Sequence, residues 1–187
     1  SRPDEELVQR GGDCDVEFED ILPGMSTAWH TSSLLAKTPL LADPPDFYYI
    51  AAEYGFGDYP YGIWLRHNGP VRFIARTMSA YRICSNDASW SSGVEERYDK
   101  LTRFMTGAAA MLEAYRAHVT DPDVLRLVDD NILKWKFQLL YTQGKDKELR
   151  RPPYNKLLKT KPLRFRINNA VKCLFPALHR LYRRKQG

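Results

Sequence analysis

Cysteines, long apolar runs and common catalytic signatures are scarce in this sequence of 187 residues. The three cysteines, Cys14, Cys84 and Cys173, lie far apart and form no CxxC pair. This argues against a disulfide framework and favours a reducing compartment. No apolar run approaches the roughly 18 residues that a membrane-spanning helix needs, and no signal peptide is recognisable. These absences predict a cytoplasmic chain.

Missing motifs argue against several kinds of cofactor or catalytic site. The sequence has no glycine-rich phosphate loop, Walker pattern, GxGxxG fingerprint or GxSxG nucleophile signature. Its histidines are scattered, and none is paired with a cysteine at the spacing of a zinc site. The chain begins with Ser1, and its first methionine is Met25, so we expect the natural start to lie upstream.

The charge is distributed very unevenly. Residues 145–187 contain 14 Lys and Arg against 2 Asp and Glu, whereas the rest of the chain contains 14 basic and 21 acidic residues. An acidic body with a basic tail indicates an anionic partner or an extensively solvated tail. The four Trp, eight Phe and eleven Tyr supply enough apolar surface for a real core.

Apolar periodicity and turn residues predict strands and helices in the first half and helices alone in the second. We expect a loop or frayed entry over 1–20, strands over 26–36, 71–74 and 78–83, an aromatic helix or turn over 47–54, and a helix over 58–67. Amphipathic helices are expected over 94–119, from Asp121 to Gly144, and over 163–184 with a bend at Pro176.

This order of elements is α/β or α+β, with too few strands for a complete parallel-sheet enzyme. We expect three regions: an α/β body over 1–92, a helical pair over 93–144 and a basic amphipathic tail over 145–187.

Three short motifs follow one another in an informative order. They are His30-Thr31-Ser32-Ser33 on a predicted strand, then Gly57-Asp58-Tyr59-Pro60 at a predicted helix start, and last Ser79-Ala80-Tyr81-Arg82 at a strand end followed by Trp90-Ser91. Over residues 20–140 this ordered set resembles the second half of family 2 glycosyltransferases, particularly bacterial enzymes of surface-polysaccharide synthesis.

The resemblance implies a GT-A fold, present here as a partial Rossmann-like unit without its N-terminal nucleotide-binding half and followed by a helical C-terminal region. It also implies an inverting transfer of sugar from a nucleotide-sugar donor to a glycan or lipid-linked acceptor. Asp58 matches the general base of such enzymes. A carboxylate suits a helix start because backbone N–H groups orient it there. The alternative is that Asp58 only caps the helix.

The same resemblance suggests substrate-binding residues. On the strand, alternation sends His30 and Ser32 to one face and Thr31 and Ser33 to the other. Arg82 matches the diphosphate site, where a guanidinium fork fits phosphate oxygens. The remaining candidates are Tyr59, Tyr81 and Trp90. For each residue the alternative is structural: a backbone hydrogen bond, a surface ion pair or a cover over the core.

Two features depart from the family pattern. Family members often carry a histidine where this chain has Cys84. Asp13-Cys14-Asp15 spells the DxD pattern that holds Mg²⁺ or Mn²⁺, but no buried apolar strand precedes it and it lies too close to Asp58. We therefore expect the metal-binding DxD upstream of residue 1, no metal or cofactor on this chain, and no activity from it alone.

Residues 156–185 alternate basic with apolar and aromatic side chains, which is typical of a helix lying on an anionic membrane surface. We therefore expect a peripheral location at the inner face of the cell membrane and no nucleic-acid partner. The alternative is that the apolar stripe packs on preceding helices. The competing function is a non-catalytic, membrane-peripheral interaction or scaffold domain.

Overall fold

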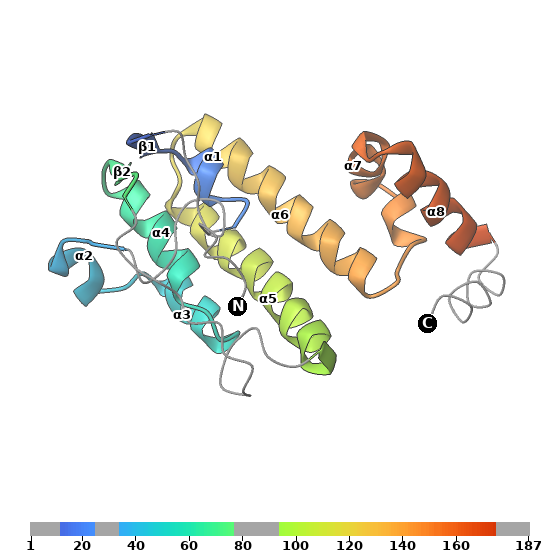
Figure 1. Ribbon diagram of the computed structural model, residues 1–187, viewed down its shortest axis with the longest axis horizontal. Helices are drawn as coiled ribbons and strands as arrows, with labels where there is room; N and C mark the ends of the chain where they lie inside the picture. The colour runs from blue at the N-terminus through green and yellow to red at the C-terminus, as the bar shows by residue number, and fades with distance from the viewer. Residues whose placement is uncertain (1–11, 25–33, 77–93, 175–187) are drawn as a thin grey trace. The chain divides into compact units, whose positions relative to one another are not determined.

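The computed structural model describes residues 12–24, 34–76 and 94–174, and side chains within the last range from Tyr98 onward (Figure 1). This part of the chain is mostly helical and contains one two-stranded sheet. Its elements are β1 (Cys14–Val16), α1 (Phe18–Ile21), α2 (Thr38–Ala42), α3 (Asp46–Glu53), α4 (Asp58–His67), β2 (Val71–Phe73), α5 (Val94–Tyr115), η3 (Arg116–His118), α6 (Pro122–Thr142), η4 (Glu148–Arg150), α7 (Tyr154–Thr160) and α8 (Leu163–Leu174).

The chain forms two compact units, residues 1–132 and 133–187, and the boundary falls inside α6. We call them unit 1 and unit 2. The region boundaries expected near residues 92 and 144 stay predictions. Among the described residues, no helix combines the length and apolar character that crossing a membrane requires.

Helix α4 and strand β2 confirm the sequence prediction for the middle of the body. Helix α4 covers 58–67 as expected, and β2 begins at Val71 as expected. The aromatic segment after Pro45 is a helix, α3, rather than a turn. The strand expected over 26–36 is wrong where it can be checked, because 34–36 have no regular structure. Its remainder, and the strand expected over 78–83, lie outside the described residues.

The prediction that residues 1–20 form only a loop is wrong for its described part. Strand β1 pairs antiparallel with β2, with Cys14 opposite Phe73 and Val16 opposite Val71. Between these pairs Asp15 lies opposite Arg72, and their side chains form an ion pair at 3.0 Å. Helix α1 follows directly, and a capping box between the Glu17 and Asp20 positions fixes its start.

The two long helices, α5 and α6, have ends that local features mark. Helix α5 begins at Val94, as predicted, but gives way after Tyr115 to η3. The Asp121 carboxylate accepts the Asp123 N–H at 2.8 Å and so caps the start of α6. Gly144 has a φ of 70°, a left-handed conformation that lets the chain leave α6 after Thr142.

Tyr115 on α5 lies at the centre of the unit 1 core and is fully buried. Its ring contacts Phe47 of α3, with 5.2 Å between ring centroids, and Phe18 of α1 at 6.5 Å. Its hydroxyl lies 3.2 Å from Nδ1 of His67 on α4. Burial raises the pKa of Tyr115, which keeps the phenol neutral. One side chain therefore joins three helices to α5.

Unit 2 has its own apolar core and a buried polar network. Phe137 of α6, Leu149 of η4 and Leu158 of α7 form the buried cluster. Asn169 of α8 is 1% exposed, and its amide donates to Oδ1 of Asp146 at 2.8 Å. Because a polar group buried without a partner is costly, this network fixes α8 against the segment before η4.

Helix α5 approaches α3 closely because residue 107 is glycine. A Cβ at Gly107 would lie 2.5 Å from both Cβ and Cγ of Tyr54, closer than any normal contact. We expect Gly107→Ala to lower the free energy of unfolding by about 1–3 kcal/mol through overpacking. Urea denaturation measures the change. Gly69→Ala is the matched control, because a Cβ there meets nothing within 4 Å, and an equal loss in both variants contradicts the close-packing account.

His67 links stability to pH. Desolvation, and then the charge of His118, lower the pKa of His67 below 6.5. Below pH 6.5 the unfolded chain therefore binds a proton that the folded chain takes up less readily, so we expect the free energy of unfolding to fall on acidification. Denaturation of His67→Gln across this range tests it: the variant is expected to show a shallower pH dependence, and an unchanged slope contradicts the assignment.

Candidate functional site

Asp58 is the first residue of α4, one position after the N-cap Gly57. The alternative role expected for Asp58 was that of a helix cap, but Gly57 occupies the N-cap position. One carboxylate oxygen of Asp58 accepts the N–H of Tyr59 at 2.9 Å. The side chain is half-buried. The carboxylate is therefore held in one orientation at the positive end of a ten-residue helix.

Tyr59, a predicted substrate contact, belongs to the core of unit 1. Its side chain is 1% exposed, and its hydroxyl donates to the Leu22 carbonyl oxygen at 2.5 Å. This hydrogen bond joins the start of α4 to the residue that follows α1. Because its ring is buried and its hydroxyl is hydrogen-bonded, Tyr59 helps to position Asp58 and offers no surface for a sugar.

Three tyrosines that we call the tyrosine cluster, Tyr48, Tyr49 and Tyr61, lie beside the start of α4. A Cβ at Gly57 would lie 3.0 Å from the Tyr48 hydroxyl, so the Tyr48 ring covers the residue before Asp58. The rings of Tyr48 and Tyr61 are 4.6 Å apart, and Tyr49 meets Tyr48 edge-on at 5.7 Å. Tyr49 is 58% exposed. Tyr48 and Tyr61 therefore pack against each other, and Tyr49 offers an aromatic surface open to solvent.

The hydroxyls of this cluster are also partly constrained. Tyr61 donates to the Leu41 carbonyl oxygen of α2 at 3.3 Å. Desolvation raises the pKa of Tyr61, and the neighbouring Tyr48 raises it further. Tyr61 therefore remains a neutral hydrogen-bonding group at ordinary pH.

A cavity of about 200 Å³ opens between the end of α3 and α5. Its aromatic lining comes from Tyr54, Phe56 and Phe104, and its charged lining from Lys100 and Arg103. Arg103 donates from Nη2 to the Glu53 carbonyl oxygen at 2.6 Å, which fixes the guanidinium at the helix end. Gly55, which has a φ of 87°, turns the chain from this cavity toward Asp58.

The predicted site residues are only partly available for comparison. Asp58 and Tyr59 are described: Asp58 lies at the start of α4, and Tyr59 lies in the core. The other predicted contacts lie outside the described residues: His30, Thr31, Ser32, Ser33, Tyr81, Arg82 and Trp90, together with Cys84.

The DxD-like pair has other partners in the structure. Oδ1 of Asp13 accepts the Ala75 N–H at 2.8 Å, and Asp15 pairs with Arg72 across the sheet. Within the described ranges, no three or more His, Cys, Asp or Glu side chains gather as they would around a metal ion.

Sequence reasoning missed the tyrosine cluster and the cavity beside it. The aromatic run of α3 was visible, but its relation to Asp58 depends on the packing of α3 against α4 and α5. The available signal was Gly57, whose missing Cβ allows the Tyr48 ring to approach the backbone before Asp58.

No family model, curated protein or solved structure matches this chain.

Tyr59→Phe tests whether this residue has a structural role. Removing the hydroxyl leaves the Leu22 carbonyl oxygen without its buried donor, so we expect a loss of about 1–2 kcal/mol in the free energy of unfolding. Chemical denaturation measures it. Tyr49→Phe removes an exposed hydroxyl and is expected to change stability little. An unchanged stability in Tyr59→Phe would contradict the buried hydrogen bond.

Proposed function

We propose that this chain carries the acceptor side and the general base of an inverting, GT-A type glycosyltransferase. The reaction transfers a sugar from a nucleotide-sugar donor to a glycan or lipid-linked acceptor in surface-polysaccharide synthesis. The observation that carries the proposal is the position of Asp58: a half-buried carboxylate, oriented by a backbone N–H at the first turn of α4, beside an open aromatic surface.

Asp58 acts as the base in this scheme. Its carboxylate takes the proton from an acceptor hydroxyl as that oxygen bonds to the anomeric carbon of the donor sugar. The bond from the anomeric carbon to the diphosphate breaks at the same time, and the nucleotide diphosphate leaves with the bonding electrons. Attack opposite to the leaving group inverts the anomeric configuration. A fixed carboxylate serves this step because the proton and the attacking oxygen must be placed together.

The tyrosine cluster supports the acceptor side of the proposal. The C–H face of a sugar ring packs well on an aromatic ring, and a tyrosine hydroxyl adds a hydrogen bond at its edge. Tyr49 offers exposed ring surface, and Tyr48 lies against Gly57, next to the base. The nearby cavity adds the cations Lys100 and Arg103, which suit an acceptor that carries phosphate.

The donor side of the proposal rests on residues outside the described ranges. Arg82 and Tyr81 are proposed to bind the diphosphate, with His30, Thr31, Ser32, Ser33 and Trp90 as further contacts to the sugars. Mg²⁺ or Mn²⁺ in the complete enzyme would neutralise the diphosphate charge. Asp13 and Asp15 do not fit that ion, because a backbone N–H and Arg72 already engage them.

The test is turnover of UDP-, GDP- and dTDP-sugars by the full-length chain, including any segment encoded before Ser1, with lipid-linked and free glycan acceptors. We expect Asp58→Asn to lower kcat by at least roughly 10²-fold, the scale of a lost general base. Binding of the donor is expected to change little. Asp43→Asn, an exposed carboxylate at the end of α2, is the matched control.

Two outcomes contradict the proposal. If Asp58→Asn turns over as fast as the wild type, the base lies elsewhere and Asp58 only orients the helix start. If the folded full-length chain turns over no donor with any acceptor, the chain is a non-catalytic interaction domain.

A further inference from the structure

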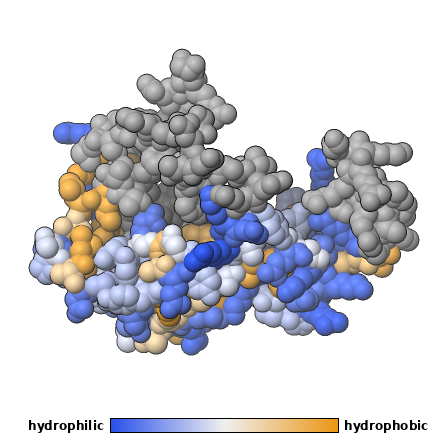
Figure 2. Space-filling view, turned by 90° about the horizontal axis from the view of Figure 1, so that it is seen from below, coloured by the Kyte–Doolittle hydropathy of each residue, from blue (hydrophilic) through white to orange (hydrophobic). Residues whose placement is uncertain are grey.

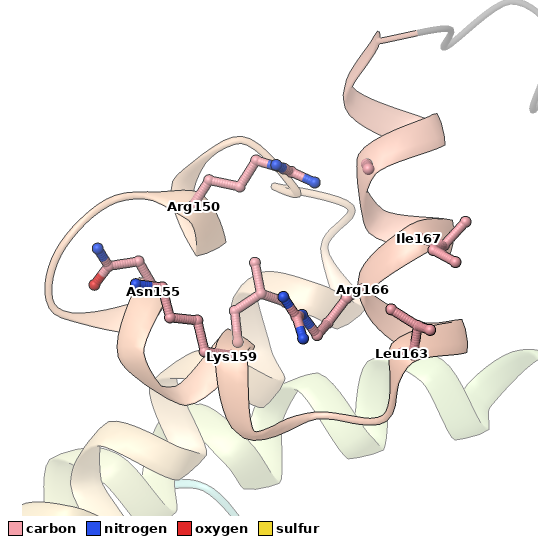
Figure 3. Close-up of a pocket in the computed structure, with 8 residues that line it drawn as sticks. Arg150, Asn155, Lys159, Leu163, Arg166 and Ile167 are labelled. Atoms are coloured by element: carbon pink, nitrogen blue, oxygen red, sulfur yellow. The ribbon is translucent and has the colours of Figure 1, made fainter.

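A cavity of about 410 Å³ lies within unit 2, between η4, α7 and α8 (Figure 3). Its polar lining is cationic: Arg150 comes from η4, Lys159 from α7 and Arg166 from α8, with Asn155 beside them. The apolar lining is Leu158, Leu163, Ile167 and Ala170. Among the described residues that line the cavity, none is acidic.

Of these cations, Arg150 is held in place by a side-chain hydrogen bond within unit 2. In Figure 3, Arg150 extends from η4 toward α8, and Arg166 extends back from α8 toward α7. Nε of Arg150 donates to Oδ1 of Asn169 at 3.1 Å, and that amide is buried and bonded in turn to Asp146. Lys159 extends toward Asn155 in Figure 3, and all three cations line the cavity. Like charges that line one cavity repel each other, so an anion in the cavity is stabilised.

A stripe of apolar side chains runs along α8 next to this cavity, and we call it the apolar stripe: Leu163, Ile167, Val171 and Leu174. They are 66%, 54%, 39% and 71% exposed. At the helical repeat these positions fall within an arc of roughly 80°, so they form one continuous face. In the space-filling view, apolar patches lie among hydrophilic side chains that cover much of the visible described surface (Figure 2).

The apolar stripe is not the face that holds α8 in unit 2. The inward face carries Phe165, whose ring lies 4.8 Å from that of Tyr141, and the buried Asn169. These two positions lie on the opposite side of the helix from the stripe. Helix α8 therefore has one apolar face for its own core and a second that this core does not need.

The cavity and the stripe meet at Leu163 and Ile167, which belong to both. A ligand that matches this arrangement has an anionic head joined to an apolar tail. Guanidinium groups match phosphate oxygens through paired N–H donors, and lysine adds a point charge. Charged helices with exposed apolar faces bind anionic bilayers by the same combination of forces.

We propose that unit 2 docks on an anionic phospholipid bilayer, with a lipid phosphate headgroup in the basic cavity and the apolar stripe of α8 against the acyl chains. The headgroup phosphate is held by Arg150, Lys159 and Arg166, and Leu163 and Ile167 mark the boundary between head and tail. This inference stands on unit 2 alone and does not depend on the proposed transferase activity.

Co-sedimentation of the full chain with lipid vesicles tests the proposal. The vesicles contain phosphatidylcholine alone or an equimolar mixture with phosphatidylglycerol. We expect binding to the mixed vesicles only, and a loss on the order of 10- to 30-fold in Lys159→Gln/Arg166→Gln, from two charges at the surface. Lys147→Gln/Lys156→Gln removes the same net charge from exposed positions outside the cavity lining, and we expect a clearly smaller loss.

A second variant tests the apolar stripe: Leu163→Ser/Ile167→Ser is expected to weaken vesicle binding without lowering the melting temperature, because both side chains are exposed. Equal losses in the two charge variants, or unchanged binding in either cavity or stripe variant, overturn the proposal. So does equal binding to neutral vesicles.

Other occupants of this surface give different results. If Leu163→Ser/Ile167→Ser converts a dimer to a monomer in sedimentation velocity and vesicle binding is unchanged, the stripe is an interface between copies. Binding of inorganic phosphate by calorimetry, without binding to vesicles, indicates a soluble anion. Retention of RNA without vesicle binding indicates a nucleic-acid surface. Each of these results overturns the lipid assignment.

Discussion

The close approach of α5 to the end of α3 is the constraint on which the arrangement around Asp58 depends. Gly107 has no side chain, so the backbone of α5 comes within reach of Tyr54 and Phe56. Phe56 then packs on Phe104 of α5, with 4.8 Å between ring centroids, and lies 6.4 Å from the ring of Tyr59. The start of α4 is thus held by aromatic contacts that a longer side chain at position 107 would displace.

The same contacts explain why a loop rich in glycine can support an oriented carboxylate. Gly55 and Gly57 would be flexible in isolation, since glycine loses the most conformational freedom on folding. Here Tyr48 covers Gly57 from α3, and Tyr59 anchors the next residues through the Leu22 carbonyl oxygen. Asp58 therefore stands between Gly57, which the half-buried Tyr48 ring covers, and the buried Tyr59, although Asp58 itself remains half-buried.

Local sequence signals predicted the parts of the fold that local chemistry determines. Helix α4 has its acidic first residue, its early proline and its terminating Asn68-Gly69 all in the sequence, so its bounds could be predicted. Strand β1 could not, because three residues with an aspartate in the middle carry no strand signal. Their pairing depends on β2, which lies more than fifty residues later in the sequence.

The sequence alone also could not show which tyrosines are buried and which remain accessible. Tyr59 and Tyr61 are two positions apart on α4, so they point to different sides of the helix. Which side faces the core depends on how α1, α3 and α5 pack around α4, and this packing buries Tyr59. A motif identifies the carboxylate that follows Gly57 but does not say which neighbouring aromatic side chain remains accessible.

The buried amide of Asn169 has a consequence for the proposed docking of α8. Asn169 is hydrogen-bonded to both Arg150 and Asp146, and Nζ of Lys172 lies 3.9 Å from the Asp146 carboxylate. If α8 left unit 2, these polar groups would lose their partners. Many amphipathic segments are unstructured in water and become helical only on contact with their target, which costs conformational entropy. Helix α8 is already folded within unit 2, so the proposed docking on a bilayer would not carry the entropic cost of folding this helix.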